Sequence, residues 1–205
     1  MRRKFLWMAS LMMLTMSLQA ESIESRLLGL HNGNTSYVAL FEETKAMPKL
    51  NKETKKRGIL YFSYAGELSM RYSEPDGDYN IIRCDGKFLT LRGGKKMDIP
   101  MNEKHPTQFV IFRNTLLLSM RGDVASVAKE NGATLTCTEN SKQFVCRIEK
   151  NKQQKVGVVS LDLIYDKQTG GLQLLRLNEA NGNYTEYSAS SGKMNVAIPQ
   201  EVWKE

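Results

Sequence analysis

The sequence predicts a mainly β protein of the α+β class, an incomplete antiparallel β-barrel of about 10–11 strands whose concave face is covered by helices. Three observations lead to this prediction. Most of the chain alternates apolar and polar residues with the period of two that half-buried strands show. Asp-Gly, Gly-Gly and Asn-Gly pairs separate these runs, as they do in antiparallel hairpins. Three short stretches have the spacing of amphipathic helices instead.

Residues 1–20 have the features of a secretory signal peptide. A basic Arg-Arg-Lys start precedes an apolar run, and the small residue Ala20 stands before the acidic Glu21. The apolar run is too short for a transmembrane helix. We therefore expect cleavage near Ala20 and export of one domain, residues 21–205. An uncleaved N-terminal anchor is the alternative.

The charge balance gives no reason to expect a polyanionic partner. The chain has 29 Lys and Arg residues against 22 Asp and Glu residues, a net charge of +7. Three of the basic residues and none of the acidic ones lie in the leader, so the exported part keeps 26 basic against 22 acidic residues, a charge of +4. So small an excess indicates that nucleic acid is not a partner.

A short helix is expected after the leader, followed by the first strand. Apolar residues at helical spacing up to Leu30 precede the turn-prone segment 31–34. Residues 37–41 then alternate as a strand. The basic stretch Lys45 to Arg57, with Pro48 near its start, is predicted to be a solvated loop between two strands.

A docking surface is the alternative for this basic stretch. Its candidate residues are Lys55, Lys56 and Arg57. The partner would be an acidic protein or an anionic membrane face, and binding would weaken with salt.

Strands dominate from residue 58 to 100 and again from residue 133 onward. The first group is predicted at 58–64, 68–72, 79–84, 88–91 and 97–100, and the second at 133–137, 144–148, 159–165, 172–177 and 184–189. Between the groups, Phe109, Phe112 and Leu116 indicate a helix with a broad apolar face. Asp123 is placed to cap a second short helix, 124–130.

The predicted sheet has more apolar inner surface than three short helices can cover tightly. An incompletely filled interior is a candidate cavity for an apolar ligand. In an average protein a plain core is the more common explanation of such an apolar stripe, and both explanations stay open at this point.

No catalytic or metal-binding arrangement emerges from the sequence. The chain has two histidines, His31 and His105, and both are expected to be exposed loop residues. Neither has a Ser, Cys or carboxylate at a spacing typical of a triad or a ligand set. We therefore expect no catalytic residue, no metal, no cofactor and no enzymatic activity.

The three cysteines inform the fold. Cys137 and Cys146 fall on the same apolar face of two strands joined by a short turn, in an exported chain where disulfides are permitted. A cross-strand disulfide follows if they face each other, whereas a one-step change in the turn would leave them diagonal. In the bonded case, Cys84 is expected to be a small buried apolar residue.

Four segments follow the leader in a characteristic order. They are Phe41-Glu-Glu-Thr-Lys45, Gly58-Ile-Leu-Tyr-Phe62, Leu68-Ser-Met-Arg-Tyr-Ser-Glu-Pro75 and Ile82-Arg-Cys-Asp-Gly-Lys87. In this order they resemble the LolA family, periplasmic carriers of outer-membrane lipoproteins. The central helix and the closing strands fit as well, so the resemblance covers nearly the whole exported part.

The resemblance implies a periplasmic, monomeric carrier with a cavity for lipoprotein acyl chains under a helical lid. Its implied partners are acylated lipoproteins, an inner-membrane lipoprotein-releasing ABC transporter and an outer-membrane acceptor. The implied cavity residues are Phe41, Leu60, Phe62, Tyr64, Leu68, Met70, Tyr72, Phe109, Phe112 and Leu116. Tyr64 stands where the best-studied branch of the family has an arginine that helps to hold the lid closed, so the latch is expected to differ here.

Two other functions remain as alternatives. The first is a carrier or sensor of another envelope lipid on the same fold. The second is an envelope interaction module with a filled core and no lipid. The identity of any lipid that accompanies the purified protein separates the three functions.

Overall fold

The computed structural model describes residues 21–73, 76–99, 108–150 and 157–205; the expected signal peptide and His105 lie outside them. The strands are β1 (Ser36–Met47), β2 (Lys52–Ser63), β3 (Glu67–Ser73), β4 (Asp76–Ile82), β5 (Phe88–Arg92), β6 (Lys95–Ile99), β7 (Ala133–Glu139), β8 (Gln143–Lys150), β9 (Val158–Asp166), β10 (Leu172–Glu179) and β11 (Tyr184–Met194). The helices are α1 (Ile23–Leu30), α2 (Gln108–Met120) and α3 (Val124–Glu130), with short 3-10 turns η1 (Pro48–Leu50) and η2 (Gln200–Trp203).

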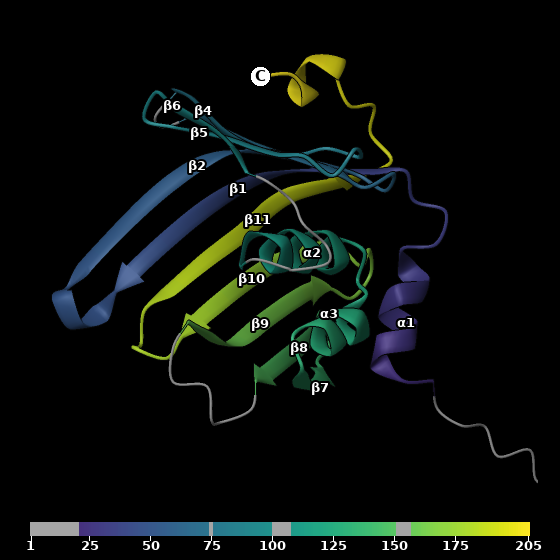
Figure 1. Ribbon diagram of the computed structural model, residues 1–205. Coiled ribbons are helices and arrows are strands. Elements are labelled where there is room, and N and C mark those ends of the chain that lie inside the picture. Colours follow the sequence, from purple (N-terminus) through teal and green to yellow (C-terminus); the bar gives the residue numbers. More distant parts are fainter. Residues whose placement is uncertain (1–20, 74–75, 100–107, 151–156) are drawn as a thin grey trace, which may run out of the picture.

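All described strands belong to one antiparallel sheet with the order β6-β5-β4-β3-β2-β1-β11-β10-β9-β8-β7 (Figure 1). Strands that follow one another in the chain pair as hairpins within β1–β6 and within β7–β11, and β1 pairs with β11 in the middle of the sheet. β6 and β7 form the two edges and do not meet, so the barrel is open. The predicted incomplete antiparallel barrel is confirmed.

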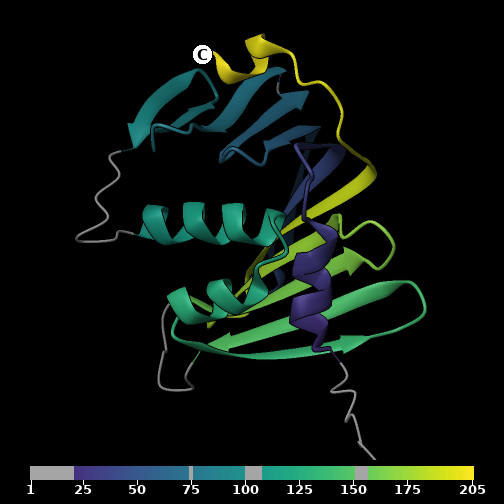
Figure 2. The ribbon, with the colours of Figure 1, turned by 90° about the vertical axis from the view of Figure 1, so that its right-hand side faces the viewer.

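The sheet is strongly curved, and the helices lie on its concave side (Figure 2). β1–β6 form one wing and β7–β11 the other. α2 and α3 follow β6 in the chain, lie side by side between the wings and lead into β7, as the sequence predicts. Asp123 caps α3 by accepting a hydrogen bond from the backbone N–H of Ser126 at 3.0 Å.

Every second residue of each strand points to the concave side, and these residues form the main apolar core. In the row across β1, β2 and β3, Gly58 lies between Phe41 and Tyr72. Because Gly58 has no side chain, the two rings meet edge to face with centroids 5.0 Å apart. A Cβ atom at Gly58 would overlap the backbone carbonyl of Arg71. A glycine is therefore required at this crossing of strands.

The wing of β7–β11 continues the same core. Its largest concave residues, each at most 2% exposed, are Phe144, Ile148, Leu161, Leu163, Tyr165 and Leu175. They pair in register across β8, β9 and β10 and lie beneath α3 and the C-terminal part of α2. The concave core thus extends across both wings.

The prediction of a loop over Lys45 to Arg57 is wrong. β1 continues to Met47, β2 begins at Lys52, and only η1 and Asn51 connect them. Met47 pairs directly with Lys52, and the left-handed Asn51 (φ 49°) completes the tight turn. The stretch carries few apolar residues, so alternation of hydrophobicity could not reveal its strands. Backbone pairing between the two strands holds it extended.

The cysteines are placed partly as expected. Cys137 and Cys146 are a directly opposite pair on β7 and β8 and are joined by a disulfide. Cys84, by contrast, is exposed, and the prediction of a buried residue is wrong. The reason is that β4 ends at Ile82, so Cys84 lies in the turn to β5 rather than on the strand.

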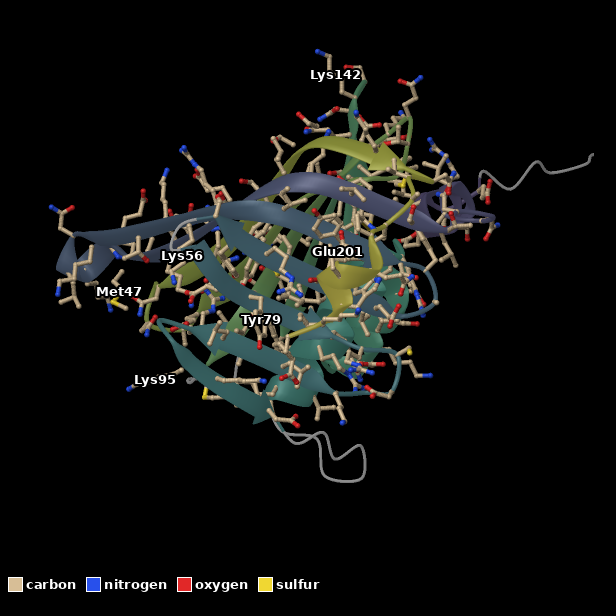
Figure 3. The ribbon with its side chains drawn as sticks, turned by 90° about the horizontal axis from the view of Figure 1, so that it is seen from above. Met47, Lys56, Tyr79, Lys95, Lys142 and Glu201 are labelled. Carbon is tan, nitrogen blue, oxygen red and sulfur yellow. A yellow bond between two sulfur atoms is a disulfide. The ribbon has the colours of Figure 1, made fainter. Side chains whose placement is uncertain are left out.

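The C-terminal segment crosses the convex side of the sheet. The Ser69 hydroxyl donates a hydrogen bond to the carbonyl of Val202 at 2.7 Å, and the guanidinium of Arg71 donates to the same carbonyl at 2.8 Å. Arg71 also lies over the ring of Tyr79, 4.9 Å from its centroid. These contacts cover the convex side of β3 near Glu201 (Figure 3).

We expect the variant Cys137→Ala/Cys146→Ala to lose about 2–3 kcal/mol of unfolding free energy, because the disulfide closes a short loop, with a sequence separation of 9, and so restricts the unfolded chain. Urea denaturation followed by circular dichroism measures the change. Cys84→Ala is the control and should change the free energy by less than about 0.5 kcal/mol, since its thiol is exposed. Equal midpoints for the double variant and the wild type would contradict the expectation.

Candidate functional site

Most of the residues implied to face a ligand are gathered on the concave side of β1, β2 and β3. The side chains with an exposed fraction between 0% and 7% are Phe41, Leu60, Phe62, Leu68, Met70 and Tyr72, together with Leu116 of α2. Tyr64 and Phe112 are partly buried against this group, whereas Phe109 is 51% exposed and lies outside the apolar cluster. The sheet therefore presents one apolar surface, which the helices cover.

α2 is apolar around most of its circumference. Its buried residues include Val110, Leu116 and Met120, and its partly buried ones include Phe112, Leu117 and Leu118. A helix with one face in water needs only an apolar stripe, so this distribution indicates apolar contacts on more than one side. The ring of Phe112 lies 6.4 Å from Phe88 of β5 and 6.3 Å from Tyr187 of β11. Phe112 therefore fills space between the two wings.

The C-terminal end of α2 is tied to both wings. The Tyr165 hydroxyl of β9 donates a hydrogen bond to the carbonyl of Ser119 at 3.0 Å. The guanidinium of Arg121 donates to the backbone carbonyl of Tyr64, just beyond β2, at 3.0 Å. At the opposite end of the helix, Phe109 is half exposed. In the middle of the helix, the guanidinium of Arg113 donates to the carbonyl of Gly86 at 3.3 Å.

His31 is buried, only 5% exposed, and the expectation of an exposed loop histidine is wrong. Its Nδ1 lies 2.5 Å from the hydroxyl of Tyr64, and its ring packs against Gly122 and Gly170, which come from the α2–α3 and β9–β10 turns. The absence of side chains at these two glycines makes room for the imidazole. Segments far apart in sequence thus bury a residue whose local context is turn-like.

Tyr64 connects the ends of two helices. Its side chain bonds His31 at the end of α1, and its backbone carbonyl receives Arg121 from the end of α2. Burial lowers the pKa of His31 to about 4, so the imidazole is neutral at pH 7. Burial likewise raises the pKa of Tyr64 to about 12, so His31 and Tyr64 form an uncharged pair at pH 7.

A polar network that the sequence analysis missed closes one end of the apolar surface. Glu43 is 2% exposed on the concave side of β1, accepts a hydrogen bond from the Tyr72 hydroxyl and pairs with Arg92 at 3.1 Å and Lys45 at 3.1 Å. The Asn80 amide lies 3.2 Å from the Tyr72 hydroxyl. Glu43 lies on the same face of β1 as Tyr37, Ala39 and Phe41, because every second residue of a strand faces the same side. This alternation could have predicted from the sequence that Glu43 faces the concave side.

The carboxylate of Glu43 stays ionised inside this network. Burial opposes its charge, but the hydrogen bond from Tyr72 and the charges of Arg92 and Lys45 outweigh burial and hold the pKa of Glu43 below its ordinary value. The guanidinium of Arg92 also lies 4.1 Å from the centroid of the Tyr72 ring. One end of the concave face is therefore polar and charged, and the remainder is apolar.

The proposed docking triplet does not form one surface. Lys56 points to the concave side and pairs with Asp78 at 3.2 Å. Lys55 and Arg57 point to the convex side, and both pair with Glu42, at 3.4 Å and 2.7 Å. Alternation along β2 separates the three charges, and nearby carboxylates neutralise them.

A cleft of about 440 Å³ opens beside α2. It is bounded by the β2–β3 turn, the β4–β5 turn and α2, and includes Ile82, Leu117 and Arg113. A second cleft of about 410 Å³ lies under the C-terminal segment on the other side of the sheet. Of the two, only the first borders the helix that covers the apolar surface.

No group of His, Cys, Asp and Glu residues suited to a metal ion occurs within the described ranges. In the same part of the chain, no helix has the length and apolar character to cross a membrane. The arrangement that remains is a curved apolar surface, a covering helix and a polar end.

Comparison with known proteins finds no protein-family model and no curated protein that matches this chain. Solved structures do match. An outer membrane lipoprotein-sorting protein domain from Vibrio parahaemolyticus is 11% identical, with 87% of this chain and 93% of that chain covered and a TM-score of 0.45.

Two further matches are a LolA superfamily protein from Nitrosomonas europaea and the lipoprotein LppX from Mycobacterium tuberculosis. The first is 8% identical over 91% of this chain and 99% of that chain, with a TM-score of 0.44. The second is 10% identical over 85% and 93%, with a TM-score of 0.43. The LolA superfamily, which the sequence resembles, is thus found among the structural neighbours, and the likeness concerns the fold.

We expect the burial of His31 to make the protein lose stability below about pH 6.5. The unfolded histidine has a pKa near 6.5 and the folded one a pKa of about 4, so the unfolded chain takes up the proton first and stability falls as the pH drops between these values. From pH 7 to pH 5 the loss from this residue is about 2 kcal/mol.

Urea denaturation at the two pH values measures this loss for the wild type and for His31→Gln. The variant has no titrating group at this position, so its unfolding free energy should change by about 2 kcal/mol less between pH 7 and pH 5. Equal changes in both proteins would show that His31 does not titrate with a lowered pKa.

Proposed function

We propose that this protein is a periplasmic carrier that binds the acyl chains of lipoproteins between α2 and the concave face of the sheet. The observation that supports this function best is the pairing of a continuous apolar sheet surface with a covering helix that is itself apolar on several sides. Such a helix can leave the sheet and still bury apolar side chains against a lipid.

The energetics fit reversible loading. An acyl chain of about 15 methylenes gains roughly 12 kcal/mol on leaving water, close to the binding free energy of a nanomolar complex. A carrier has to release its cargo, so part of this gain must be offset. Moving Leu116 and Phe112 away from the sheet provides the offset, because their contacts with the concave face are lost when an acyl chain replaces them.

The entry route we propose is the side of α2 that borders the 440 Å³ cleft. Ile82 and Leu117 give this cleft an apolar part next to the covered surface. Opening here would break the hydrogen bond from Arg113 to the carbonyl of Gly86, both of which line the cleft, while the hydrogen bonds at Ser119 and Arg121 keep the C-terminal end of α2 attached to the protein.

The resemblance in sequence supports the finer parts of the proposal. The signal peptide expected from the sequence supports export to the periplasm, where the carrier would accept a lipoprotein from an inner-membrane ABC transporter and pass it as a monomer to an outer-membrane acceptor. We propose that it acts by binding rather than catalysis, since the buried carboxylates of Glu43 and Asp78 on the concave face are already paired with basic side chains.

A second candidate function is an interaction module without lipid. It is favoured by one observation, which is that the concave residues are already covered by the protein's own helices. A carrier of another envelope lipid would use the same surface. The identity of the lipid that co-purifies with the protein therefore distinguishes the three candidate functions.

Native mass spectrometry of protein purified from the exporting cell tests the proposal. We expect a co-purifying acylated lipopeptide on the wild type and at least about a tenfold smaller loaded fraction for Met70→Glu, because a carboxylate on the apolar face opposes burial of an acyl chain. Leu40→Glu is the matched control and should load like the wild type, since Leu40 is 52% exposed on the convex side of β1.

Circular dichroism checks that each variant keeps the sheet. Because Met70→Glu also places a charge in the core, Met70→Gln serves as a milder second variant and should lose loading to an intermediate degree. A different lipid on the wild type would point to the other carrier function. No lipid at all, or equal loading of all variants, would overturn the proposal.

A further inference from the structure

The β1–β2 hairpin projects beyond the neighbouring strand of its wing. β1 and β2 pair along their whole length, from Ser36 opposite Ser63 to Met47 opposite Lys52. β3 pairs with β2 only as far as Gly58 opposite Tyr72. Within the described residues, 52–57 therefore have no strand partner on that side. Six residues at about 3.3 Å each make a projection of roughly 20 Å (Figure 1).

The tip of this hairpin carries apolar side chains in water. Met47 is 43% exposed. Leu50, at 63%, is the most exposed large apolar residue in the described part of the chain. The turn that carries them contains Pro48 and ends at Asn51, which has a left-handed backbone conformation. The geometry of this turn requires neither a methionine nor a leucine, and the two exposed apolar side chains together form a small apolar patch at the tip.

Lysines surround these apolar residues. Lys49 and Lys52 are exposed at the tip, and neither makes an ion pair within the described ranges. Farther from the tip, Lys45 and Lys55 are paired with Glu43 and with Glu42 and Glu53, respectively. The tip thus has uncompensated positive charge next to exposed apolar groups.

We propose that the hairpin tip, residues 47–52, docks on an anionic lipid bilayer. Met47 and Leu50 would enter the boundary between headgroups and acyl chains, and Lys49 and Lys52 would lie at the level of the lipid phosphates. An acidic protein surface could match the lysines but would not by itself account for the adjacent pair of apolar residues. Both features together fit a membrane surface.

Docking in this way would turn the polar end of the concave face toward the bilayer. Glu43 and Lys56 lie opposite each other at the base of the hairpin, at the end of the apolar row formed by Phe41 and Ala39. Figure 3 shows Met47, Lys56 and Lys95 on the same side of the molecule, while Lys142 lies at another end. The bilayer contact itself does not require that the concave face bind lipid.

Vesicle co-sedimentation tests the inference with the exported protein. The probes are vesicles with about 30% phosphatidylglycerol in phosphatidylcholine, and vesicles of phosphatidylcholine alone. We expect binding to the anionic vesicles that weakens with added salt, and little binding to the neutral ones. Lys49→Glu/Lys52→Glu should lower the partition coefficient at least about tenfold, and Leu50→Ser about threefold or more.

The control variant Lys129→Glu/Lys142→Glu carries the same change of charge away from the hairpin and should bind as the wild type does. Equal loss in both double variants would assign binding to overall charge and overturn the inference, as would an absence of vesicle binding by the wild type. Because Met70→Glu lies on the concave face, it should lose lipid loading but keep vesicle binding. The two proposals can therefore fail independently.

Discussion

An antiparallel sheet that is apolar on one side and does not close must have that side covered. β6 and β7 stay apart as edges, so the concave residues of both wings depend on α2 and α3 for exclusion from water. This requirement explains why the chain crosses from β6 to β7 over the concave side and why Leu116, Met120 and Val127 are buried there. Under the proposed function, α2 is the element that a bound acyl chain would displace.

The two ends of α2 differ in how firmly they are held. Hydrogen bonds from Tyr165 and Arg121 tie its C-terminal end to opposite wings, and the neighbouring His31–Tyr64 pair joins that end to α1. The buried, uncharged contact between His31 and Tyr64 weakens when His31 takes up a proton. The C-terminal end of α2 is thus joined to both wings, and the middle of the helix combines apolar contacts of Phe112 and Leu116 with a hydrogen bond from Arg113 to the carbonyl of Gly86.

The sequence predicted the features that follow from alternation along a single strand. It did not predict the burial of residues whose neighbours in the fold lie far away in the sequence. Alternation put Cys137 and Cys146 on the same face of two neighbouring strands and put Leu60, Met70 and Leu68 on one face, whereas the turn decided that the cysteines lie directly opposite each other. It missed the strands around Lys52 because most side chains of the hairpin end are charged or exposed. It could not show that Gly122 and Gly170 leave room for His31, since these residues meet only in the folded chain. The concave position of Glu43 could have been predicted, because Glu43 lies two residues after Phe41 and therefore on the same face of β1.

The central claim is that an acyl chain occupies the concave face beneath α2. A lipopeptide with a photoreactive diazirine at the end of its acyl chain tests this most directly, with cross-linked peptides identified by mass spectrometry. The account predicts cross-links to concave residues of β2 and β3, such as Phe62 and Met70, and to the side of α2 that carries Leu116. Cross-links confined to the convex side, for example at Leu40 or Val196, would contradict it.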